Sequence, residues 1–343
     1  MRHTQRLTLG DISVNFAKVI LDTLSDMGFA TANLRDNFSL NCEFLATPEA
    51  RISIPKYMRL GHQAIMMTGK PELGLTFGAN TNNGITGLAA LAAQCAPTLE
   101  IALKHFIEME TLNSHNSRGR SRFYIEEGRA VCHFYSISPY NRYNHFVVDA
   151  MLSTWWNFCQ TQSLNPVQCH HIEIEYPKPA HADAFEEYFG CPILFEQKRN
   201  ALFLKRHHHQ QQLKDSCEST FTKLRELCEQ EKLKHTAGTT TADQVVDLIS
   251  ANLSGTPPDI DAIARKLGIA GWTLRRRLAK EGLKFQTLLD DTRNALAQTY
   301  VRDTEHNFTE IAFLLGFSSP SAFQRAFKRW TSMSPGNYRN QKR

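Results

Sequence analysis

Basic and aromatic side chains alternate over residues 311–330, which read IAFLLGFSSPSAFQRAFKRW. Positions i and i+4 of a helix share a face, so Phe323 and Phe327 pack together in a helix while Arg325 and Lys328 stay in solvent. Ammonium and guanidinium groups bind phosphates, and a guanidinium also donates two parallel hydrogen bonds to guanine. The spacing therefore predicts one face that packs and one face whose chemistry suits nucleic acid.

The start of this stretch occurs twice in the chain. Residues 263–268 read IARKLG and residues 311–316 read IAFLLG, 48 positions later. Each copy continues into a turn with glycine and a second amphipathic stretch, where Leu274 and Leu278 match the packed aromatic positions of the later copy. One such helix is weak support for DNA binding, because any surface helix has a charged face. Two matched copies predict two helix-turn-helix motifs, whose second helices enter major grooves about 12 Å wide.

Charge is distributed unevenly along the 343 residues. Residues 240–343 contain 15 Lys and Arg against 10 Asp and Glu, whereas residues 1–239 contain 24 of each. The net charge of +5 therefore belongs to the last third of the chain. A basic module joined to a neutral one indicates an anionic partner for that module.

The elements that must position the motifs divide the chain into two domains. Residues 234–242, KHTAGTTTA, are small and polar, which is typical of a linker. We expect an α+β domain over residues 1–233. The all-α DNA-binding domain covers residues 243–343, with FQTLLDDTRNALAQTYV as a helix between the two motifs.

Periodicity and turn residues predict the elements of the first domain. The expected helices and strands are residues 14–29 (helix), two helices broken near Pro97 with Thr98 as an N-cap, 122–127 and 130–137 (a hairpin), 146–164 (helix), 170–177 (strand), 183–190 (helix) and 201–206 (strand). Residues 214–234 form an amphipathic helix with Phe221, Leu224 and Cys228 near one face. That face either closes its own domain or pairs with a partner subunit, which would make the chain a homodimer.

Composition argues against several classes of protein. No run of about 18 apolar residues occurs, and the N-terminus lacks the apolar core of a secretory signal, so we expect a cytoplasmic protein without membrane contact. The eight cysteines include no Cys-x-x-Cys pair, which predicts neither a zinc site nor a disulfide framework. His207, His208 and His209 are adjacent and cannot all face one metal from a regular element. The sequence therefore predicts no metal and no cofactor.

Residues 259–339 resemble the DNA-binding domain of the AraC/XylS family of bacterial transcription regulators. The resemblance rests on IARKLG, TLRRRLAKEG, FQTLLDDTRNALA, EIAFLLGFSSPSAFQRAFKRW and MSPGNYR. The family implies two motifs joined by a rigid linker helix, with recognition helices here at about residues 271–280 and 320–330. Each recognition helix reads one of two adjacent major grooves. The family also implies double-stranded promoter DNA and RNA polymerase as partners.

The resemblance assigns roles to individual residues. Base-reading positions are matched by Trp272, Arg275, Arg276, Ser321, Ala322 and Arg325, and phosphate contacts fall to Arg277, Gln324, Lys328 and Arg329. The chain departs from the family pattern at two places. Ala270-Gly271 stands where Ser-Pro is common, which leaves the first recognition helix without a side-chain N-cap, and Ser332 stands where glycine is usual.

Residues 1–213 resemble the arabinose-binding-like α+β domain of one AraC-type subgroup through PELGLTFG, APTLEIALKHF and EYFGCPILFEQKRNALFL. The resemblance implies a domain that senses a small molecule or mediates dimerisation, without naming the ligand. Aromatic and cationic residues near expected strand–helix junctions are candidates for a pocket that takes an anionic or amphipathic effector. They are Arg122, Arg142, Tyr143, His145, Trp155 and Trp156. The alternative for each is core packing or plain surface.

These patterns favour a ligand-responsive transcription regulator, expected to be an activator and not an enzyme, over two alternatives. A DNA-modifying alkyl acceptor needs an activated cysteine, for which Cys132-His133 and Cys169-His170-His171 are the nearest candidates. Neighbours on a strand point to opposite faces, which argues against both. The other alternative is an architectural DNA binder that takes no ligand.

Overall fold

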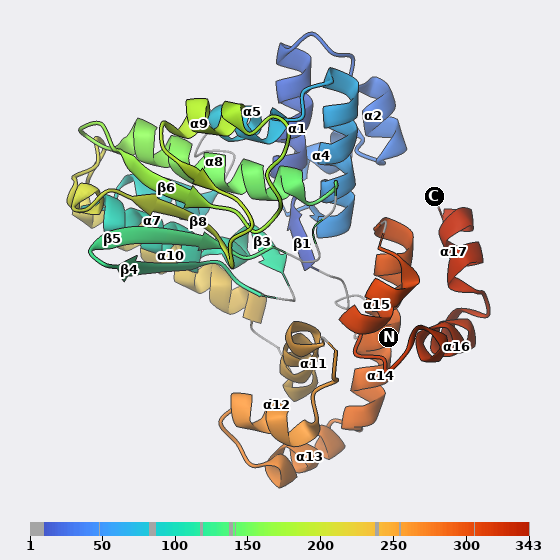
Figure 1. Ribbon diagram of the computed structural model, residues 1–343. Helices are drawn as coiled ribbons and strands as arrows, with labels where there is room; N and C mark the ends of the chain where they lie inside the picture. Colours follow the sequence, from blue (N-terminus) through green and yellow to red (C-terminus); the bar gives the residue numbers. More distant parts are fainter. Residues whose placement is uncertain are drawn as a thin grey trace. The chain divides into compact units, whose positions relative to one another are not determined.

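The computed structural model describes residues 10–47, 49–81, 87–116, 119–136, 140, 142–236, 240–253, 255–304 and 306–342 (Figure 1). Residues 12–115 and 119–235 form one compact unit, and residues 236–343 belong to a second. The expected linker, residues 234–242, contains this division, and its residues 237–239 lie outside the described part of the chain. Within the described ranges, no helix combines the length and the apolar character needed to cross a membrane.

The first unit contains both helices and sheets. Its strands are β1 (Gly10–Ser13), β2 (Arg51–Ser53), β3 (Ser114–Asn116), β4 (Arg122–Glu126), β5 (Arg129–Phe134), β6 (Cys169–Glu173), β7 (Ile193–Leu194) and β8 (Asn200–Leu204). Its helices are α1 (Val14–Asp26), α2 (Ala32–Asn37), α3 (Cys42–Ala46), α4 (Ile54–Thr68), α5 (Leu73–Asn80), α6 (Leu88–Gln94), α7 (Leu99–Glu108), α8 (His145–Gln162), α9 (Asp183–Phe189) and α10 (Glu218–Thr236), with the 3-10 helices η2 (Glu110–Leu112) and η3 (His208–Gln210). The expected α+β class is confirmed.

The larger sheet has the strand order β4-β5-β8-β6-β7. β4 and β5 form the hairpin expected from the sequence, with Arg122 opposite His133. β8 pairs antiparallel with both β5 and β6, while β6 and β7 are parallel. The three short strands β1, β2 and β3 form a separate sheet of order β2-β1-β3. The sequence analysis predicted neither this small sheet nor α2 to α5.

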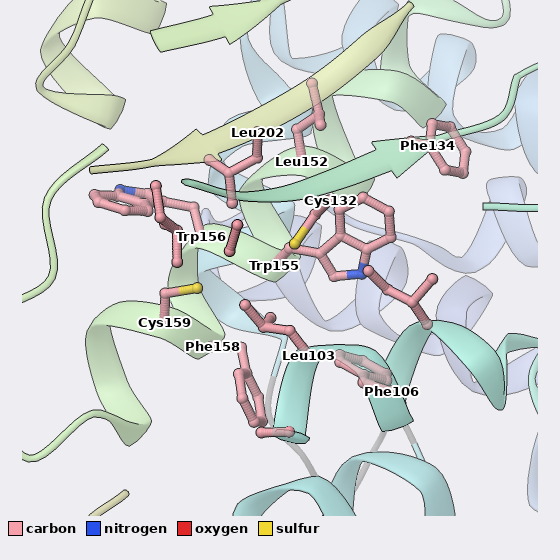
Figure 2. Close-up of a cluster of buried hydrophobic side chains, with 14 of the residues drawn as sticks. Leu103, Phe106, Cys132, Phe134, Leu152, Trp155, Trp156, Phe158, Cys159 and Leu202 are labelled. Atoms are coloured by element: carbon pink, nitrogen blue, oxygen red, sulfur yellow. The ribbon is translucent and has the colours of Figure 1, made fainter. Parts of the chain in front are cut away.

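The main core lies between the larger sheet and the helices α7 and α8 (Figure 2). Alternate residues of β5 and β8 face this core, because successive side chains of a strand point to opposite sides of a sheet. The contributing side chains include Cys132, Phe134, Leu202, Leu103, Phe106, Leu152, Trp155, Trp156, Phe158 and Cys159. Figure 2 shows both tryptophans of α8 among these apolar side chains, where Trp155 meets Phe134 edge to face at 6.1 Å between centroids.

Two glycines let α5 cross α8 at short range. A Cβ on Gly74 would lie 2.6 Å from the Cβ of Asp149, and one on Gly78 would lie 1.9 Å from Ser153 Oγ. The Ser153 hydroxyl donates a hydrogen bond to the carbonyl of Gly74 over 3.0 Å, which fixes the crossing. The close approach requires glycine at both positions, since any side chain there would push the helices apart.

Helix α10 packs on the core of its own unit. Phe221 and Cys228 are buried in the main core, and Leu224 packs against it. The same helix leaves Leu227 exposed. The sequence left two roles open for the apolar face of this helix, packing within its own domain or pairing with a partner subunit. The buried face packs within its own domain.

The second unit is all-helical. Its helices are α11 (Thr241–Asn252), α12 (Ile260–Lys266), α13 (Gly271–Lys280), α14 (Phe285–Asp303), α15 (Phe308–Leu314), α16 (Pro320–Thr331) and α17 (Pro335–Lys342). α12–α13 and α15–α16 are the two expected helix-turn-helix motifs, and α14 is the helix between them. Both turns use glycine in the left-handed region, Gly268 at φ 67° and Gly316 at φ 66°. In both, an N–H bonds back five residues, from Ile269 to Ala264 and from Phe317 to Ala312.

Candidate functional site

The first motif presents α13 on an aliphatic base. Leu274 and Leu278 are buried, one turn apart, against Ile263 and Ala264 of α12. The small side chain of Ala264 suits the close crossing of the two helices. α12 itself begins at Asp259, whose carboxylate accepts a hydrogen bond from the N–H of Ala262 over 2.6 Å. The buried side of α13 therefore fixes which residues of that helix face solvent.

The outward face of α13 carries the residues predicted to read bases. Trp272 is 62% exposed, and the guanidinium of Arg276 lies over its ring, 5.0 Å from the centroid. Arg275 Nη2 is 3.6 Å from a carboxylate oxygen of Asp261. Arg277 is exposed beside them. Two of the predicted arginines thus have defined partners in the protein itself, which limits the directions in which they extend.

The N-terminus of α13 has an unusual arrangement. Ala270 has the extended backbone of an N-cap, φ −74° and ψ 148°, but it makes no side-chain cap hydrogen bond. The next residue, Gly271, has no side chain, and a Cβ there would lie 1.7 Å from Asp261 Oδ1. The Asp261 carboxylate therefore stands at the positive end of the helix dipole, where a negative charge is favourable.

The second motif presents α16 with a complete N-terminus. The Ser319 hydroxyl accepts a hydrogen bond from the N–H of Ala322 over 3.2 Å, and Pro320 is the first helical residue, as the sequence analysis expected. The outward face lies on the side predicted from the sequence: Ser321, Gln324, Arg325, Lys328 and Arg329 are exposed, and Ala322 is half-buried.

An aromatic cluster supports α16 from below. Phe323 and Phe327 are fully buried with centroids 5.7 Å apart, and Phe317 and Tyr338 extend the cluster on either side. Trp330 packs on Phe317 at 6.0 Å. The aromatic residues that alternate with cations in the sequence thus form the base from which those cations project.

Arg293 of α14 holds the turn of the second motif. Its guanidinium donates hydrogen bonds to the carbonyls of Leu315, over 3.0 Å, and Gly316, over 2.8 Å, and it lies 4.8 Å above the Phe317 ring. Burial lowers the pKa of this side chain, and the negative charge of Asp290 opposes that effect. The sequence analysis missed this residue. The sequence signal that could have identified it is an arginine on the packed face of the expected linker helix.

The end of α16 explains why glycine is usual at residue 332. Ser332 has φ 62° and ψ 4°, in the left-handed region, and its N–H bonds to the carbonyl of Lys328 over 2.8 Å. A residue with a Cβ is strained in this conformation, which glycine adopts without penalty.

The six residues proposed for an effector pocket lie in different surroundings. Trp155 and Trp156 were expected at a strand–helix junction, but they lie within α8 and are 3% and 7% exposed in the main core. This correction has a simple cause, because α8 is apolar on most sides and its large residues fill the space beneath the sheet. Arg122 is exposed on the edge strand β4.

Arg142 and Tyr143 lie together just before α8. The Arg142 guanidinium is 5.2 Å from the Tyr143 ring centroid, and that ring meets His62 of α4 edge on at 4.7 Å. Arg142 is exposed and Tyr143 is half-buried.

His145, the sixth residue, belongs to a polar group that the sequence analysis did not assemble, here named the carboxylate–tyrosine cluster. Its members are Tyr140, His145, Asp149, Glu175, Tyr176 and Asn200. The His145 ring stacks on Tyr176 at 4.2 Å, and the Tyr176 hydroxyl donates a hydrogen bond to Asp149. The Tyr140 hydroxyl donates to Glu175, and Asn200 Nδ2 donates to the same carboxylate over 2.7 Å.

Burial controls the protonation of this cluster. It raises the pKa of Asp149 to about 7, although the hydrogen bond from Tyr176 acts in the opposite direction. Burial also raises the pKa of Glu175 and, with the positive charge of His181, lowers that of His145. A charged residue inside the apolar run FVVDAMLSTWW was the sequence signal for Asp149. A buried carboxyl group whose pKa is raised to about 7 among aromatic side chains marks a candidate functional site.

Comparison with known families covers both units. Residues 28–213 match the arabinose-binding domain of AraC transcription regulator, N-terminal, which is more than half of the chain. Residues 263–341 match a helix-turn-helix domain.

Curated relatives are transcription regulators. The chain is 28% identical over 352 residues to the ornithine utilization regulator of Pseudomonas aeruginosa, covering 99% of both chains. It is 38% identical over 100 residues to the HTH-type transcriptional regulator VirS of Mycobacterium tuberculosis, covering 29% of each. Among solved structures, transcriptional regulator CdpR from Pseudomonas aeruginosa matches 95% of this chain and 98% of that chain, with 20% identity and a TM-score of 0.48.

Proposed function

Because the chain belongs to the AraC/XylS family of DNA-binding transcription regulators, we propose that α13 and α16 read two adjacent major grooves of one operator. The observation that carries the proposal is the matched pair of outward faces. Each recognition helix buries positions i and i+4 and exposes arginine at the equivalent places, Arg276 and Arg325. An arginine there reaches the O6 and N7 atoms of guanine with two parallel hydrogen bonds.

The exposed residues divide into readers of bases and anchors to phosphate. Trp272, Arg275, Arg276, Ser321, Ala322 and Arg325 take the first role, and Arg277, Gln324, Lys328 and Arg329 take the second. For Arg277, Lys328 and Arg329 the distinction has a physical basis, since these three lie further along their helices than the residues assigned to bases. Gln324 precedes Arg325, and its role is taken from the family resemblance alone. Phosphate contacts fix position without reading sequence.

Selection of binding sites from random DNA tests this division. Arg276→Ala and Arg325→Ala should each cost about 1–3 kcal/mol of binding and relax the preference at one base pair. Lys328→Ala should weaken binding on all sequences alike and reduce the slope of log affinity against log salt by roughly one unit. If the arginine variants bind more weakly but select an unchanged sequence, these arginines do not read bases.

We propose that the effector binds at the carboxylate–tyrosine cluster and carries a positive charge. Arg122 and Arg142, which would suit an anion, are exposed, whereas the cluster holds the buried carboxyl group of Asp149 and the half-buried carboxyl group of Glu175 beside aromatic rings. Carboxylates and ring faces both attract cations. The full-length relative is named for utilization of ornithine, an amino acid with a second ammonium group, and this supports the class of ligand.

Thermal unfolding of the full chain with small amines, matched carboxylic acids and neutral analogues tests the effector class. Amines such as ornithine should raise the melting temperature, and Glu175→Gln should remove most of that rise while leaving the ligand-free chain folded. Stabilisation by the acids alone, or a rise that survives Glu175→Gln together with Asp149→Asn, would exclude this site.

The remaining roles follow from the family. We propose that the chain acts as a transcription activator in the bacterial cytoplasm, that it contacts RNA polymerase, and that it forms a homodimer. The exposed Leu227 of α10 supports pairing through the first unit. We further propose that it is no enzyme: burial raises the pKa of the Cys132 and Cys169 thiols, so neither supplies the thiolate that alkyl transfer needs. Sedimentation of the full chain with and without operator DNA tests the dimer.

A further inference from the structure

Two cysteines meet where α10 begins. Cys217 directly precedes α10 and is exposed, and Cys95 follows the last residue of α6 and is half-buried. The N–H of Cys217 donates a hydrogen bond to the carbonyl of Cys95 over 2.9 Å. Such a bond keeps the two Cα atoms within about 7 Å, and disulfides join Cα atoms roughly 4.4–6.8 Å apart. The backbone thus already places the two residues at disulfide range.

The surroundings of Cys217 favour its thiolate. Its sulfur lies 3.4 Å from the Ser219 hydroxyl and 3.1 Å from that of Thr220, at the N-terminus of a 19-residue helix. The hydrogen bonds from Ser219 and then from the side chain and backbone of Thr220 lower the pKa of Cys217 to about 7. The positive end of a helix dipole acts in the same direction.

Cys95 has the opposite character. Burial raises the pKa of its thiol, and the negative charges of Cys217 and Asp215 add to that effect. One partner is therefore an accessible nucleophile, and the other is a protonated thiol held beside it.

The other cysteines lack this combination. Burial raises the pKa of Cys132, Cys159, Cys169 and Cys228, and Cys191 is buried as well. Cys42 is exposed at the start of α3, where its sulfur lies 3.5 Å from Arg35. Cys42 thus serves as a matched control for an exposed thiol.

We propose that Cys217 and Cys95 form a peroxide-responsive thiol pair that closes to an intramolecular disulfide. The Cys217 thiolate attacks an oxygen of hydrogen peroxide, the O–O bond breaks, and Cys217 sulfenic acid and hydroxide result. Cys95 then loses its proton and attacks the sulfenic sulfur, the S–S bond forms, and the S–O bond breaks with release of water. In total, two thiols are oxidised and one peroxide is reduced to two waters.

The disulfide would tie the end of α6 to the first turn of α10, the helix whose last residues precede the DNA-binding unit. Cellular thiols reverse the bond by exchange, so the pair responds to the redox state of the cytoplasm. This inference is independent of the effector site and of base reading.

Mapping of disulfides by mass spectrometry tests the pair in the full chain. Reduced protein is treated with one equivalent of hydrogen peroxide, free thiols are blocked, and peptides are separated without reductant. The wild type and Cys42→Ser should yield a peptide joined through Cys95 and Cys217. Cys217→Ser should yield no such product, and Cys95→Ser should stop at a sulfenic acid on Cys217 that dimedone traps.

Alkylation rates give a second measurement that needs no oxidant. At pH 7, Cys217 should react with iodoacetamide about three to four times faster than an ordinary exposed thiol, because its larger thiolate fraction outweighs its lower intrinsic nucleophilicity. Peroxide that oxidises Cys42 as fast as Cys217, or that joins Cys217 only to a second chain, would overturn the proposal. A melting curve for each variant checks that it is folded.

Discussion

In the first helix-turn-helix motif, α13 starts at an alanine that gives it no cap, and its arginines rest on Trp272 and Asp261. In the second motif, Ser319 caps α16, aromatic rings pack beneath it, and Arg293 ties down the preceding turn. Both turns nevertheless place a left-handed glycine after the first helix and contain the same hydrogen bond across five residues, although the second turn is one residue longer. The first motif thus has ordered side chains on the exposed face of its second helix, whereas the second motif has a second helix that is itself held in place.

This difference has a consequence for recognition. Binding costs less when a contact is already ordered, whether the order resides in a side chain or in a helix. Arg275 and Arg276 would have to leave Asp261 and Trp272 before they could reach a base. The capped helix α16 needs no such rearrangement. We therefore expect the second motif to supply the more rigid half of the interface.

The largest expected effect comes from removal of the support for the second motif. Arg293→Ala leaves the carbonyls of Leu315 and Gly316 without their charged donor and removes the contact with Phe317, which should cost about 2–4 kcal/mol. Hydrogen exchange of the full chain, followed peptide by peptide, should then accelerate in α15 and α16 but not in α12 and α13.

Arg293→Lys is the matched control, because it keeps the charge but loses the forked donor, and it should restore only part of the protection. Equal acceleration in both motifs would mean that the second turn is not supported separately, and the contrast between the motifs would fail.

A smaller effect comes from exchanging the caps. Ala270→Ser adds a hydroxyl at a residue whose backbone already suits an N-cap, and it should stabilise α13 by about 1 kcal/mol. Ser319→Ala should destabilise α16 by a similar amount. Amide exchange in the first turns of the two helices measures both. If Ser319→Ala acts as expected but Ala270→Ser changes nothing, the Asp261 carboxylate already fulfils the role of the cap.

The smallest effect concerns the end of α16. Ser332→Gly relieves the left-handed backbone conformation and should stabilise the second motif by about 0.5–1 kcal/mol. Gly316→Ala, at another left-handed position of the same motif, should act in the opposite direction. Urea unfolding with a probe of the second unit measures both changes. A loss of stability in Ser332→Gly would show that this serine is not strained.

The sequence correctly predicted those features that depend on residues close together along the chain. The repeated turn, the Ser319 cap, the hairpin of β4 and β5 and the helix containing Phe221 all follow from residues a few positions apart. The solvent-exposed face of α16 was also predicted, because the burial of Phe323 and Phe327 determines which side of the helix is left in solvent.

Contacts between distant segments could not be read in the same way. Arg293 reaches a turn more than 20 residues away, and Asp149 meets Tyr176 only because α8 packs beneath the sheet. Trp155 looked available for a ligand because aromatic residues serve equally in cores and in pockets. Only the fold decides between those two uses, and here it placed the tryptophan in the core.

Helix α14 has 19 residues and so measures about 28 Å from end to end. A continuous helix cannot absorb a change in its length, and each inserted residue would rotate the helices that follow by about 100°. Substitutions on its exposed side leave that geometry unchanged, whereas a change of one residue in its length would rotate one helix-turn-helix motif relative to the other. If the two motifs bind adjacent grooves as proposed, the operator is under the same constraint: the bases between the two contacted segments can vary in kind, but not in number.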